Sequence, residues 1–334
     1  MYEVGLIVGK FWPAHNGHLH LIDAAAAQCR TLHVRVIWND DEVPTVDQRV
    51  GWLREIYSGF HNVYIDHFEN HPGNEENSYA WARFVLDMNI GRYPDAFFTS
   101  ELYGETWAEE ACKMTGRHVA HVQVDLNREA TPISGTRVRD DPIKYWDYIP
   151  RATRGHYAKR FCIIGGESTG KSTMVKHLAF MLGASYTLEA GRDFVETYGM
   201  AKDDLAIWSY ILREQPAREE EAARNSNGIV ICDTDLMTTG VWYDEWIGRD
   251  DWYNEVMASA IEESVHNYEH RFLLDHEGVP WVDDGTRSEA TRRAAFSEKL
   301  EAECRNYEVP YTKVGGTFQE RGITVIEAIK EMLQ

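Results

Sequence analysis

The chain has 334 residues, a formal net charge of −20, and hydrophobic and charged fractions of 43% and 26% that are typical of globular proteins. This length suits two domains. The sequence has no run of eighteen apolar residues, so no membrane span is predicted. Its amino terminus lacks a basic leader, so no signal peptide is predicted. Because so acidic a chain is repelled by nucleic acids and anionic membranes, we expect neither as a partner. Since neither a signal peptide nor a membrane span is predicted, we expect a cytoplasmic location.

Strand-like and helical segments alternate through the first half of the chain. Short runs rich in β-branched and aromatic residues predict strands at 2–8, 32–38, 63–66, 96–99 and 119–124. The segments between them predict helices at about 17–29, 46–58, 78–89 and 104–115. This alternation is typical of right-handed βαβ units, which build a parallel sheet with helices on both faces.

A break in this pattern predicts a domain boundary after Pro150. The segment 151–159 is rich in positive charge and is predicted to be a linker between domains at 1–150 and 160–334. Beyond it the alternation restarts, with strands predicted at 160–165, 186–188, 229–233, 271–274 and 311–314 and a closing helix near 322–333. We therefore expect two doubly wound α/β domains. The charged segment 218–224 is interpreted as a solvated helix face.

The cysteines give no sign of a disulfide framework or a metal site. The five are scattered singly, none forms a C-x-x-C pair, and their number is odd. We expect them to be reduced thiols.

The first functional motif, G-K-F-W-P-A-H-N-G-H at 9–18, follows the first predicted strand and opens the first predicted helix. Gly9 permits a tight turn at the end of the strand. His15 and His18 lie three residues apart at a helix start, so both imidazoles can face one point. Together with the N–H groups of the helix end they would form a cradle for a polyphosphate. The alternative is that the histidines are only polar caps.

This motif resembles that of the H-x-G-H nucleotidyltransferase superfamily. The segment 133–139, I-S-G-T-R-V-R, is similar to the second signature of that superfamily, with Gly135 in place of a serine. The resemblance implies that Ser134, Thr136 and Arg139 bind the phosphates of ATP, which suits the bidentate geometry of a guanidinium group. The missing serine removes one hydroxyl contact with phosphate.

The reaction implied by this resemblance is adenylyl transfer from ATP without a covalent protein intermediate. Positioning and charge neutralisation would supply the catalysis. His15 and His18 would stabilise the transferred phosphoryl group, and Lys10 and Arg139 would support the departing pyrophosphate with Mg²⁺. Phe11 lies in the same loop and is expected to contact the nucleotide.

The second functional motif, G-G-E-S-T-G-K-S at 165–172, has the phosphate-loop pattern between an apolar run and a helical stretch. Lys171 is expected to bridge the β- and γ-phosphates of ATP, and Ser172 to bind Mg²⁺. Asp233, at the tip of a predicted strand, is expected to be the second partner of the metal ion. The loop residues expected to contact the nucleotide are Gly165, Gly166, Glu167, Ser168, Thr169, Gly170, Ser172 and Thr173.

Two further clusters favour a small-molecule kinase over a GTPase or a motor. Glu189 or Asp193, just after the second strand of this domain, is expected to act on the acceptor hydroxyl group. The segment 281–287 resembles a lid that closes arginine over the phosphates, and the alternative is an ordinary polar loop. The contacts expected in and near these clusters are Arg192, Asp235, Trp281 and Arg287.

A transferase motif followed by a kinase motif in one chain resembles the NadR family, and this resemblance covers essentially the whole chain. That family joins nicotinamide mononucleotide (NMN) adenylyltransferase to ribosylnicotinamide kinase. The resemblance implies a kinase that makes NMN from nicotinamide riboside, a transferase that makes NAD and pyrophosphate from NMN, and ATP with Mg²⁺ as cofactors of both. The resemblance does not decide whether the chain forms a homo-oligomer. The dinucleotide contacts that it implies are Asn39, Trp81, Thr99, Ser100, Glu101 and Arg128.

Some members of this family begin with a helix-turn-helix DNA-binding domain. Because the first predicted strand starts at Tyr2 and the chain is acidic, we expect an enzyme without that domain. Trp81 could stack on a nicotinamide cation, or it could be a core residue of its helix. Two alternatives are the same chemistries on another phosphorylated vitamin precursor and a non-catalytic NAD or ATP sensor. A sensor predicts loss of Lys171 or of the histidines, and both are present.

Overall fold

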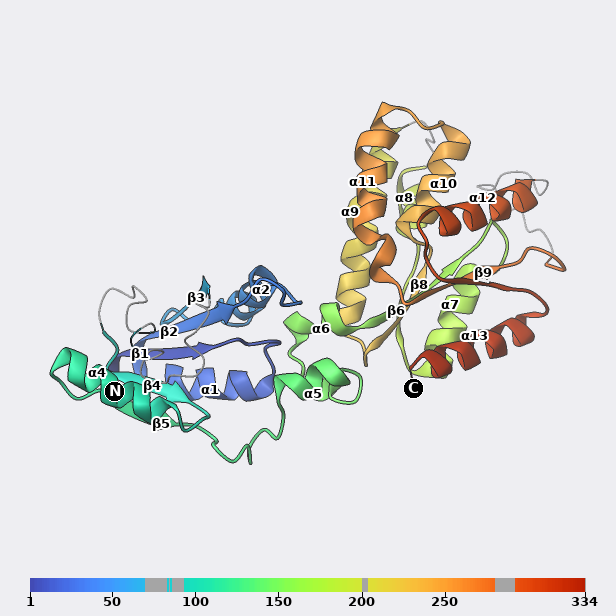
Figure 1. The fold of residues 1–334 in the computed structure, drawn as a ribbon. Helices are drawn as coiled ribbons and strands as arrows, with labels where there is room; N and C mark the ends of the chain where they lie inside the picture. Colours follow the sequence, from blue (N-terminus) through green and yellow to red (C-terminus); the bar gives the residue numbers. More distant parts are fainter. Residues whose placement is uncertain (70–82, 84, 86–92, 200–203, 280–291, 334) are drawn as a thin grey trace. The chain divides into compact units, whose positions relative to one another are not determined.

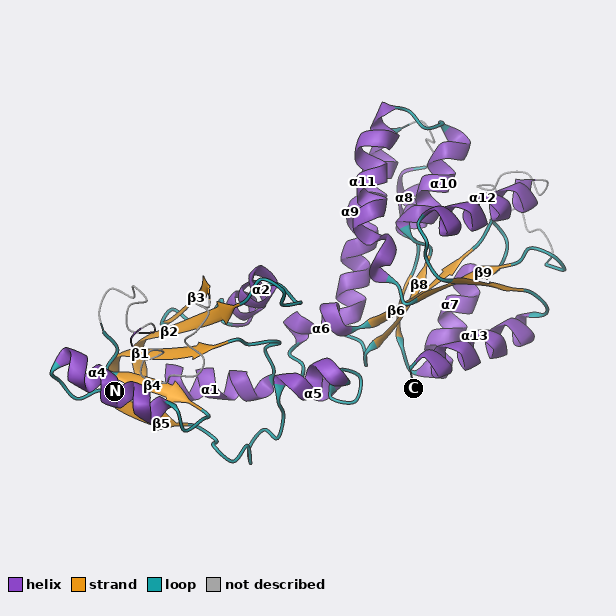
Figure 2. Cartoon of the chain, viewed as in Figure 1, coloured by secondary structure: helices purple, strands orange, loops and turns teal. Residues whose placement is uncertain are grey.

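The computed structural model describes residues 1–69, 83, 85, 93–199, 204–279 and 292–333. The chain divides into two compact units, Met1–His156 and Tyr157–Gln334. Each unit contains a five-stranded parallel sheet with helices packed around it (Figures 1 and 2). The predicted fold class, two α/β domains with parallel sheets, is therefore confirmed.

The first unit has the strand order β3-β2-β1-β4-β5. Its strands are β1 Tyr2–Gly9, β2 Cys29–Trp38, β3 Val63–Glu69, β4 Ala96–Thr99 and β5 Ala120–Gln123. Its helices are α1 Asn16–Ala26, α2 Val46–Ile56, α4 Gly104–Thr115, α5 Gly135–Asp140 and α6 Arg151–Tyr157, with a 3₁₀ turn at Trp146–Tyr148. The strand order reverses between β1 and β4, and ligands of such sheets bind at the carboxyl ends of the strands there.

The core of the first unit lies on both faces of β1. Ile7 packs in a cluster with Ile22 of α1 and Leu53 of α2, whereas its neighbour Leu6 packs with Trp107 of α4 on the other face. This placement follows from the period of two along a strand, which sends successive side chains to opposite faces. A continuous apolar run such as β1 is therefore covered by helices on both sides.

The second unit has the strand order β10-β9-β6-β8-β7. Its strands are β6 Lys159–Ile164, β7 Ser185–Thr187, β8 Ile229–Asp233, β9 His270–Leu274 and β10 Tyr311–Val314. Its α-helices are α7 Lys171–Leu182, α8 Ala190–Tyr198, α9 Leu205–Arg224, α10 Leu236–Trp246, α11 Ala258–Ser264, α12 Arg293–Asn306 and α13 Phe318–Met332. A π-helical turn at Tyr253–Met257 and a 3₁₀ turn at Val265–Asn267 flank α11.

One core cluster of the second unit lies between its sheet and a pair of helices. Residues of α7 and α13, such as Leu178 and Val325, pack on the sheet residues Phe161 and Phe272. Figure 1 shows α7 and α13 together on one side of this sheet. β6 lies at the centre of the sheet, so the loop that follows it is flanked by the ends of β8 and β9.

The predicted linker at 151–159 contains the division between the two units, which lies after His156, but most of it is helical. Residues Arg151–Tyr157 form α6, and Lys159 already belongs to β6. Pro150 directly precedes this helix, and its carbonyl group accepts the N–H groups of Thr153 and Arg154 at 2.8 and 3.2 Å. Proline is compatible with the first turn of a helix because the N–H group that it lacks has no partner there. The prediction took this proline as a chain break.

The segment 218–224 was also misinterpreted, because one of its acidic residues is buried. Glu219 is only 5% exposed although its neighbours Glu220 and Glu221 reach solvent. The predicted helix at 78–89 falls almost entirely outside the described residues. The other predicted strands and helices named above agree with the structure to within a few residues at their ends.

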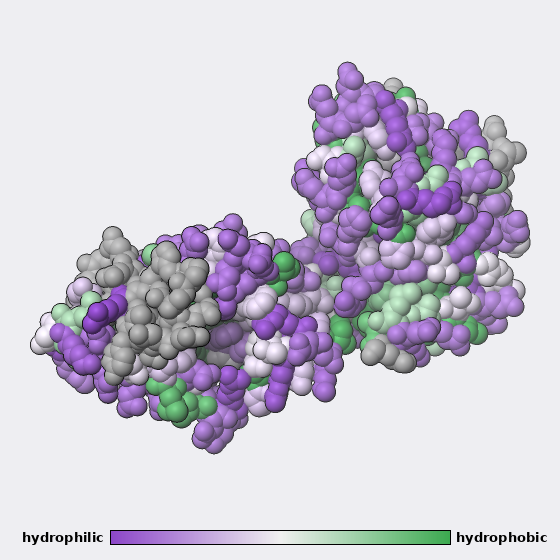
Figure 3. All heavy atoms as spheres, in the orientation of Figure 1, coloured by the Kyte–Doolittle hydropathy of each residue, from purple (hydrophilic) through white to green (hydrophobic). Residues whose placement is uncertain are grey.

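Figure 3 shows mostly purple atoms on the visible face of each unit, with scattered apolar groups between them. None of the helices that the structure describes has the length and apolar character needed to cross a bilayer. All five cysteines are free thiols, as expected, and four of them are buried.

Candidate active sites

The loop after β1 brings the two histidines of the first motif into contact. Phe11 adopts a left-handed backbone conformation with φ 47°, and its buried ring lies 4.9 Å from the ring of His18. His15 is the N-cap of α1, and its Nδ1 atom accepts the His18 backbone N–H at 3.4 Å. The two imidazole rings stack with their centroids 3.8 Å apart. His15 is therefore a helix cap, as the alternative interpretation held, but it also forms a stacked pair with His18.

Burial lowers the pKa of both imidazoles. Burial, together with the positive charge of Arg128, lowers the pKa of His15 to about 4. Burial and the nearby His15 and Arg128 place the pKa of His18 well below its usual range. Nδ1 of His18 is buried and has no hydrogen-bonding partner among the described residues. A bound polyphosphate would favour the protonated form of either ring, because an adjacent negative charge raises the pKa of histidine.

The second transferase motif lies against the first. Ser134 caps α5 by accepting the N–H of Arg137 at 3.3 Å. The guanidinium group of Arg139 lies 3.9 Å from the centre of the Trp12 ring, and it donates to the Trp12 carbonyl oxygen and to Thr136 Oγ1. These contacts bring the predicted phosphate ligands Ser134, Thr136 and Arg139 beside the histidine loop.

Gly135 occupies a position where a side chain has no room. A Cβ atom there would lie 2.5 Å from the Trp12 carbonyl oxygen, a distance that real Cβ atoms do not adopt. The backbone segments at Gly135 and Trp12 approach each other too closely for a serine side chain, which explains why glycine replaces the serine of the related signature. Glycine is common where two backbone segments approach closely.

A buried carboxylate that the sequence analysis missed anchors Lys10. Glu42 is 7% exposed and forms ion pairs with Lys10 at 2.9 Å and with Arg49 at 2.8 Å. Arg49 also donates to the Lys10 carbonyl oxygen at 2.7 Å, and Asn39 donates to Glu42 at 3.4 Å. Glu42 lies in an irregular loop of a strongly acidic chain, so no motif distinguished it from solvated carboxylates.

The ends of β4 and the following loops supply further predicted contacts. Thr99 donates to the Glu101 carbonyl oxygen at 2.6 Å, and its Oγ1 atom lies 2.8 Å from Nε2 of His121. Arg128 forms an ion pair with Glu101 at 3.1 Å. Ser100, which precedes Glu101, is half-buried. Trp81 lies outside the described residues, so its stacking role stays a prediction.

The loop after β6 has the folded form of a phosphate loop. Gly165 and Gly170 adopt positive φ angles of 147° and 86°, and Gly170 is the N-cap of α7. Thr169 Oγ1 and Lys171 Nζ both donate to the Gly166 carbonyl oxygen, at 2.8 and 3.2 Å. Backbone N–H groups at the start of α7 are therefore available for an anion, since the first turn of a helix leaves its N–H groups without partners.

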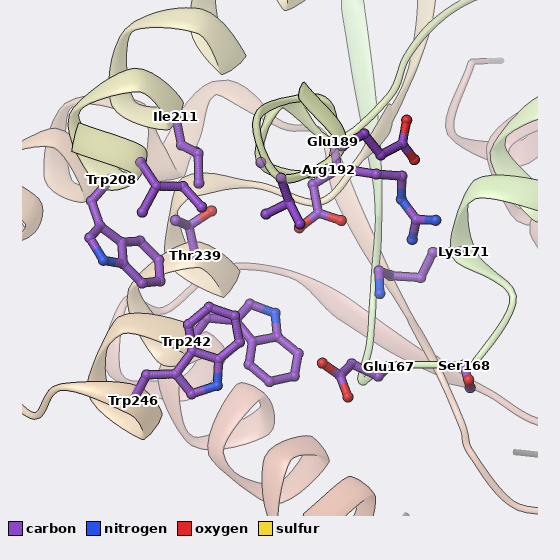
Figure 4. A pocket seen from close by; sticks show the side chains of 14 residues that line it. Glu167, Ser168, Lys171, Glu189, Arg192, Trp208, Ile211, Thr239, Trp242 and Trp246 are labelled. Carbon is purple, nitrogen blue, oxygen red and sulfur yellow. The ribbon is translucent and has the colours of Figure 1, made fainter. Parts of the chain in front are cut away.

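A cavity of about 280 Å³ opens beside this loop (Figure 4). Charged side chains of Glu167, Lys171, Glu189 and Arg192 form one side. Indole rings form the other side, with Trp246 5.6 Å from Trp208 and 5.4 Å from Trp242 between ring centres. The remaining lining residues are Ser168, Gly191, Val195, Glu196, Ile207, Ile211 and Thr239.

The aromatic side of this cavity was missed by the sequence analysis. Trp208 comes from α9, and Trp242 and Trp246 come from α10. The spacing of four between Trp242 and Trp246 places them on one face of a helix, which is the available signal. It does not distinguish a ligand wall from an ordinary core face.

The structure separates the two candidate bases of the kinase. Glu189 lines the cavity, and burial raises the pKa of its carboxyl group although nearby Lys171 opposes the shift. Asp193 is exposed outside the cavity lining and forms an ion pair with Arg218 at 2.6 Å. Glu189 precedes α8 with a non-helical backbone, whereas Asp193 lies within the helix, so their side chains leave in different directions.

The two aspartates at the end of β8 also differ in their surroundings. Asp233 is fully buried, and neither of its carboxylate oxygens has a hydrogen-bonding partner among the described residues. Asp235 caps α10 by accepting the Thr238 N–H at 2.8 Å and pairs with the buried Arg271 at 2.7 Å. Asp235, predicted as a contact, is thus engaged in the core and does not line the cavity.

Two buried arginines that the sequence analysis did not assign support the phosphate loop from behind. Arg293 donates to the Ser168 carbonyl oxygen at 3.2 Å, and Arg321 donates to those of Thr169 and Gly316 at 3.4 and 2.8 Å. Ser172 and Thr173 lie in the first turn of α7. The predicted lid, with Trp281 and Arg287, lies outside the described residues.

Comparisons with known proteins cover both units. The family described as an AAA domain matches residues 160–321. The trifunctional NAD biosynthesis/regulator protein NadR of Escherichia coli (strain K12) is 28% identical, over 99% of this chain and 83% of that protein. A phosphopantetheine adenylyltransferase of Chromobacterium violaceum is 45% identical over 64 residues, which are 19% of this chain and 39% of that protein.

Solved structures show the same fold over the whole chain. The crystal structure of a NadR protein in complex with NR has a TM-score of 0.81 and 20% identity, covering 99% of this chain and 96% of that chain. A NadR protein in complex with NAD and AMP-PNP has a TM-score of 0.80 at 20% identity, covering 100% of this chain and 97% of that one.

Proposed function

We infer that this chain, a member of the NadR family, is a bifunctional enzyme that phosphorylates nicotinamide riboside to NMN and adenylylates NMN to NAD. The observation that carries this inference is that a NAD biosynthesis protein aligns with 99% of the chain, across two units that each contain one of the candidate sites. The structural relatives that bind NR, NAD and AMP-PNP support the same substrates. The first unit is the transferase and the second is the kinase.

The kinase site fits a nucleotide with a divalent cation. Asp233 presents a buried carboxylate beside the phosphate loop that has no hydrogen-bonding partner among the described residues. Burying such a group is costly unless a cation or a donor accompanies it. Ser172 and Asp233 would hold Mg²⁺ there with the phosphates of ATP. The ion neutralises phosphate charge when bound. Lys171 contacts the β- and γ-phosphates, and Arg192 approaches the transferred group.

The phosphoryl transfer needs an acceptor hydroxyl group aimed at the γ-phosphorus. Glu189 is the carboxyl group in the cavity that lies beside Lys171 and Arg192. It orients the 5′-hydroxyl of the riboside and accepts its proton while the oxygen–phosphorus bond forms and ADP leaves. Positioning supplies most of the catalysis in such a transfer, because little covalent work falls to the protein.

The composition of the cavity favours a cationic ring over a neutral base. The indole rings of Trp242 and Trp246 line the same cavity as the carboxylates of Glu167 and Glu196. The pyridinium ring of nicotinamide riboside carries a positive charge, and a cation over an indole ring gains about 0.5–2 kcal/mol. A neutral nucleoside would gain only stacking.

In the transferase site the stacked histidines and the α5 cap would bind the phosphates of ATP. The NMN phosphate oxygen attacks the α-phosphorus, and pyrophosphate leaves toward Lys10 and Arg139. His15 and His18 donate to the oxygens of the transferred group as negative charge develops. Ser134 and Thr136 contact the leaving phosphates, while Asn39, Thr99 and Arg128 line the side where NMN binds.

The direct test is the substrate profile of the purified protein. Pyrophosphate release with ATP is followed with NMN or phosphopantetheine as acceptor, and ADP release with nicotinamide riboside or a neutral pyrimidine nucleoside. We expect turnover with NMN and with the riboside. A preference for phosphopantetheine would overturn the transferase assignment, and a preference for the neutral nucleoside would overturn the kinase substrate.

A further inference from the structure

A chain of buried hydrogen bonds ends at the residue next to Glu189. The backbone N–H of Ala190, the first residue of α8, donates to Gln215 Oε1 at 2.9 Å. Nε2 of Gln215 donates to Glu219 Oε1 at 2.9 Å. The hydroxyl group of Tyr268 lies 3.0 and 2.9 Å from the two Glu219 oxygens. Of the side chains in this series of hydrogen bonds, Gln215 and Glu219 come from α9, and Tyr268 lies two residues before β9.

All of these residues are buried away from the cavity. Gln215, Glu219 and Tyr268 are 2%, 5% and 6% exposed, and none of them lines the cavity. Gln215 and Glu219 are four apart on α9, so they share one face of that helix. A buried polar group that loses its partner costs about 1–3 kcal/mol, so each bond strongly favours the observed arrangement.

The bonds have a defined direction. The amide of Gln215 can offer its oxygen to Ala190 only if its NH₂ group finds an acceptor, and Glu219 is that acceptor. Burial raises the pKa of Glu219 to about 7, while bonds from Gln215 and Tyr268 and the charge of Arg160 oppose the rise. A carboxyl group accepts through one oxygen in either protonation state, so the orientation of Gln215 does not depend on ionisation.

The bond to Ala190 replaces a local cap. Glu189 is the N-cap residue of α8, and its side chain makes no capping hydrogen bond. The first N–H of a helix has no partner inside the helix. Because Gln215 takes up this N–H from another helix, the start of α8 is fixed without the Glu189 carboxyl group, which stays in the cavity.

We propose that Gln215, oriented by Glu219 and Tyr268, is a positioning residue for the kinase reaction: it fixes the first turn of α8 and so aims Glu189 and Arg192 at the reacting groups. This inference rests on the proposed role of Glu189. Gln215 touches neither substrate. It acts on the geometry of turnover and leaves the binding of ATP at the phosphate loop unchanged.

The test substitutes Gln215→Met, which keeps the length of the side chain and removes both hydrogen bonds. We expect the kinase kcat for the riboside to fall about ten- to hundredfold, as displacement of a catalytic group by about 1 Å can cause. The KM for ATP should stay unchanged, and NMN adenylylation by the same molecules is the internal control. Arg213→Met, an exposed change on the same helix, should leave both activities unchanged.

Coupling to Glu189 separates positioning from a general loss of stability. In a Glu189→Gln background, Gln215→Met should lower kcat little further, because both changes act on one group. Glu219→Gln retains an acceptor for the Gln215 NH₂ group and should keep most of the activity. A kcat for folded Gln215→Met close to that of the parent, or fully multiplicative losses, would overturn the proposal.

The outcomes distinguish the positioning role of Gln215 from the proposed catalytic role of Glu189. If Glu189→Gln alone retains normal turnover, the role of Glu189 is wrong and the positioning role falls with it. If Glu189→Gln is impaired and Gln215→Met is not, only the positioning role is wrong. Should Gln215→Met fail to fold, Tyr268→Phe removes one donor to Glu219 and should lower kcat with an unchanged KM for ATP. An unchanged kcat in that variant would overturn the proposal.

Discussion

At the scale of single residues, Gly135 occupies a position in the transferase site that has no room for a side chain. Its backbone approaches the Trp12 carbonyl oxygen, which also accepts from Arg139. The fit between the two motifs therefore depends on the absence of a side chain. A serine at this position, as in the related signature, would require the backbone at 135 to move away from the Trp12 carbonyl oxygen.

We predict that Gly135→Ser weakens adenylylation. Overpacking of a close contact costs about 1–3 kcal/mol, and the movement would displace Trp12 and Arg139 from the phosphate site. The variant should show a lower kcat/KM for NMN and unchanged riboside kinase activity. Equal or higher adenylylation would show that the loops separate without cost.

The stacked histidines give the first unit a pH-dependent stability. The folded-state pKa of His15, about 4, lies below the ordinary value of 6.5, so the folded state binds its proton less readily than the unfolded state. The stability is full above pH 6.5 and is lost as pH falls from 6.5 to 4. Each unit of pKa corresponds to about 1.4 kcal/mol, which sets an upper limit of about 3 kcal/mol for His15.

Urea unfolding of the transferase unit checks this expectation. The loss of stability between pH 7 and pH 4.5 should be smaller in His15→Gln than in the parent, because that variant has no imidazole to protonate at this position. Parallel losses in the two proteins would contradict the burial of a neutral His15.

At the scale of elements, α10 supplies the aromatic side of the kinase cavity. Trp242 stacks on Phe296 of α12 at 3.8 Å between ring centres and faces the cavity with Trp246. The helix therefore connects the substrate side of the cavity to the element that also supplies Arg293.

We predict that Trp242→Leu raises the KM for nicotinamide riboside about two- to thirtyfold, the range that a cation–π contact of this strength implies. The KM for ATP should not change. Trp242→Phe is the matched control, since it keeps an aromatic face, and should lose less. Equal effects of leucine and phenylalanine would indicate that the ring does not contact the substrate.

The elements also show what a sequence can reveal. β4, β8 and β10 were predicted at their observed bounds because each is a short run flanked by residues that do not continue a strand. The phosphate loop and the histidine loop each consist of consecutive residues, so both could be located from the sequence. The aromatic side of the cavity comes from α9 and α10, which only the tertiary fold brings to the phosphate loop.

Neighbouring residues of one motif could not be ranked from the sequence. Glu189 and Asp193 both follow β7, but the start of α8 between them directs one carboxyl group into the cavity and the other to Arg218. Asp233 and Asp235 differ in the same way, since Arg271 from β9 pairs with only one of them. These distinctions depend on contacts between distant segments.

At the scale of the whole molecule, each unit carries its own candidate phosphate site. The candidate transferase site is built from β1, α1, β4 and α5 of the first unit, and the candidate kinase site from β6, α7, β8 and α8–α10 of the second. Because no described residue of either site is shared with the other, NMN made in the kinase site can leave and be used by any transferase site. The two activities should be separable by single substitutions.

The measurement that tests this account most directly is complementation between two variants in one reaction. Lys171→Ala should lose riboside phosphorylation by about 10²–10³ and retain adenylylation, and His18→Ala should do the reverse, so that NMN accumulates. Mixing the two proteins with nicotinamide riboside and ATP should restore NAD formation. If folded Lys171→Ala also fails to adenylylate NMN, or if the mixture makes no NAD, the assignment of two independent sites is wrong.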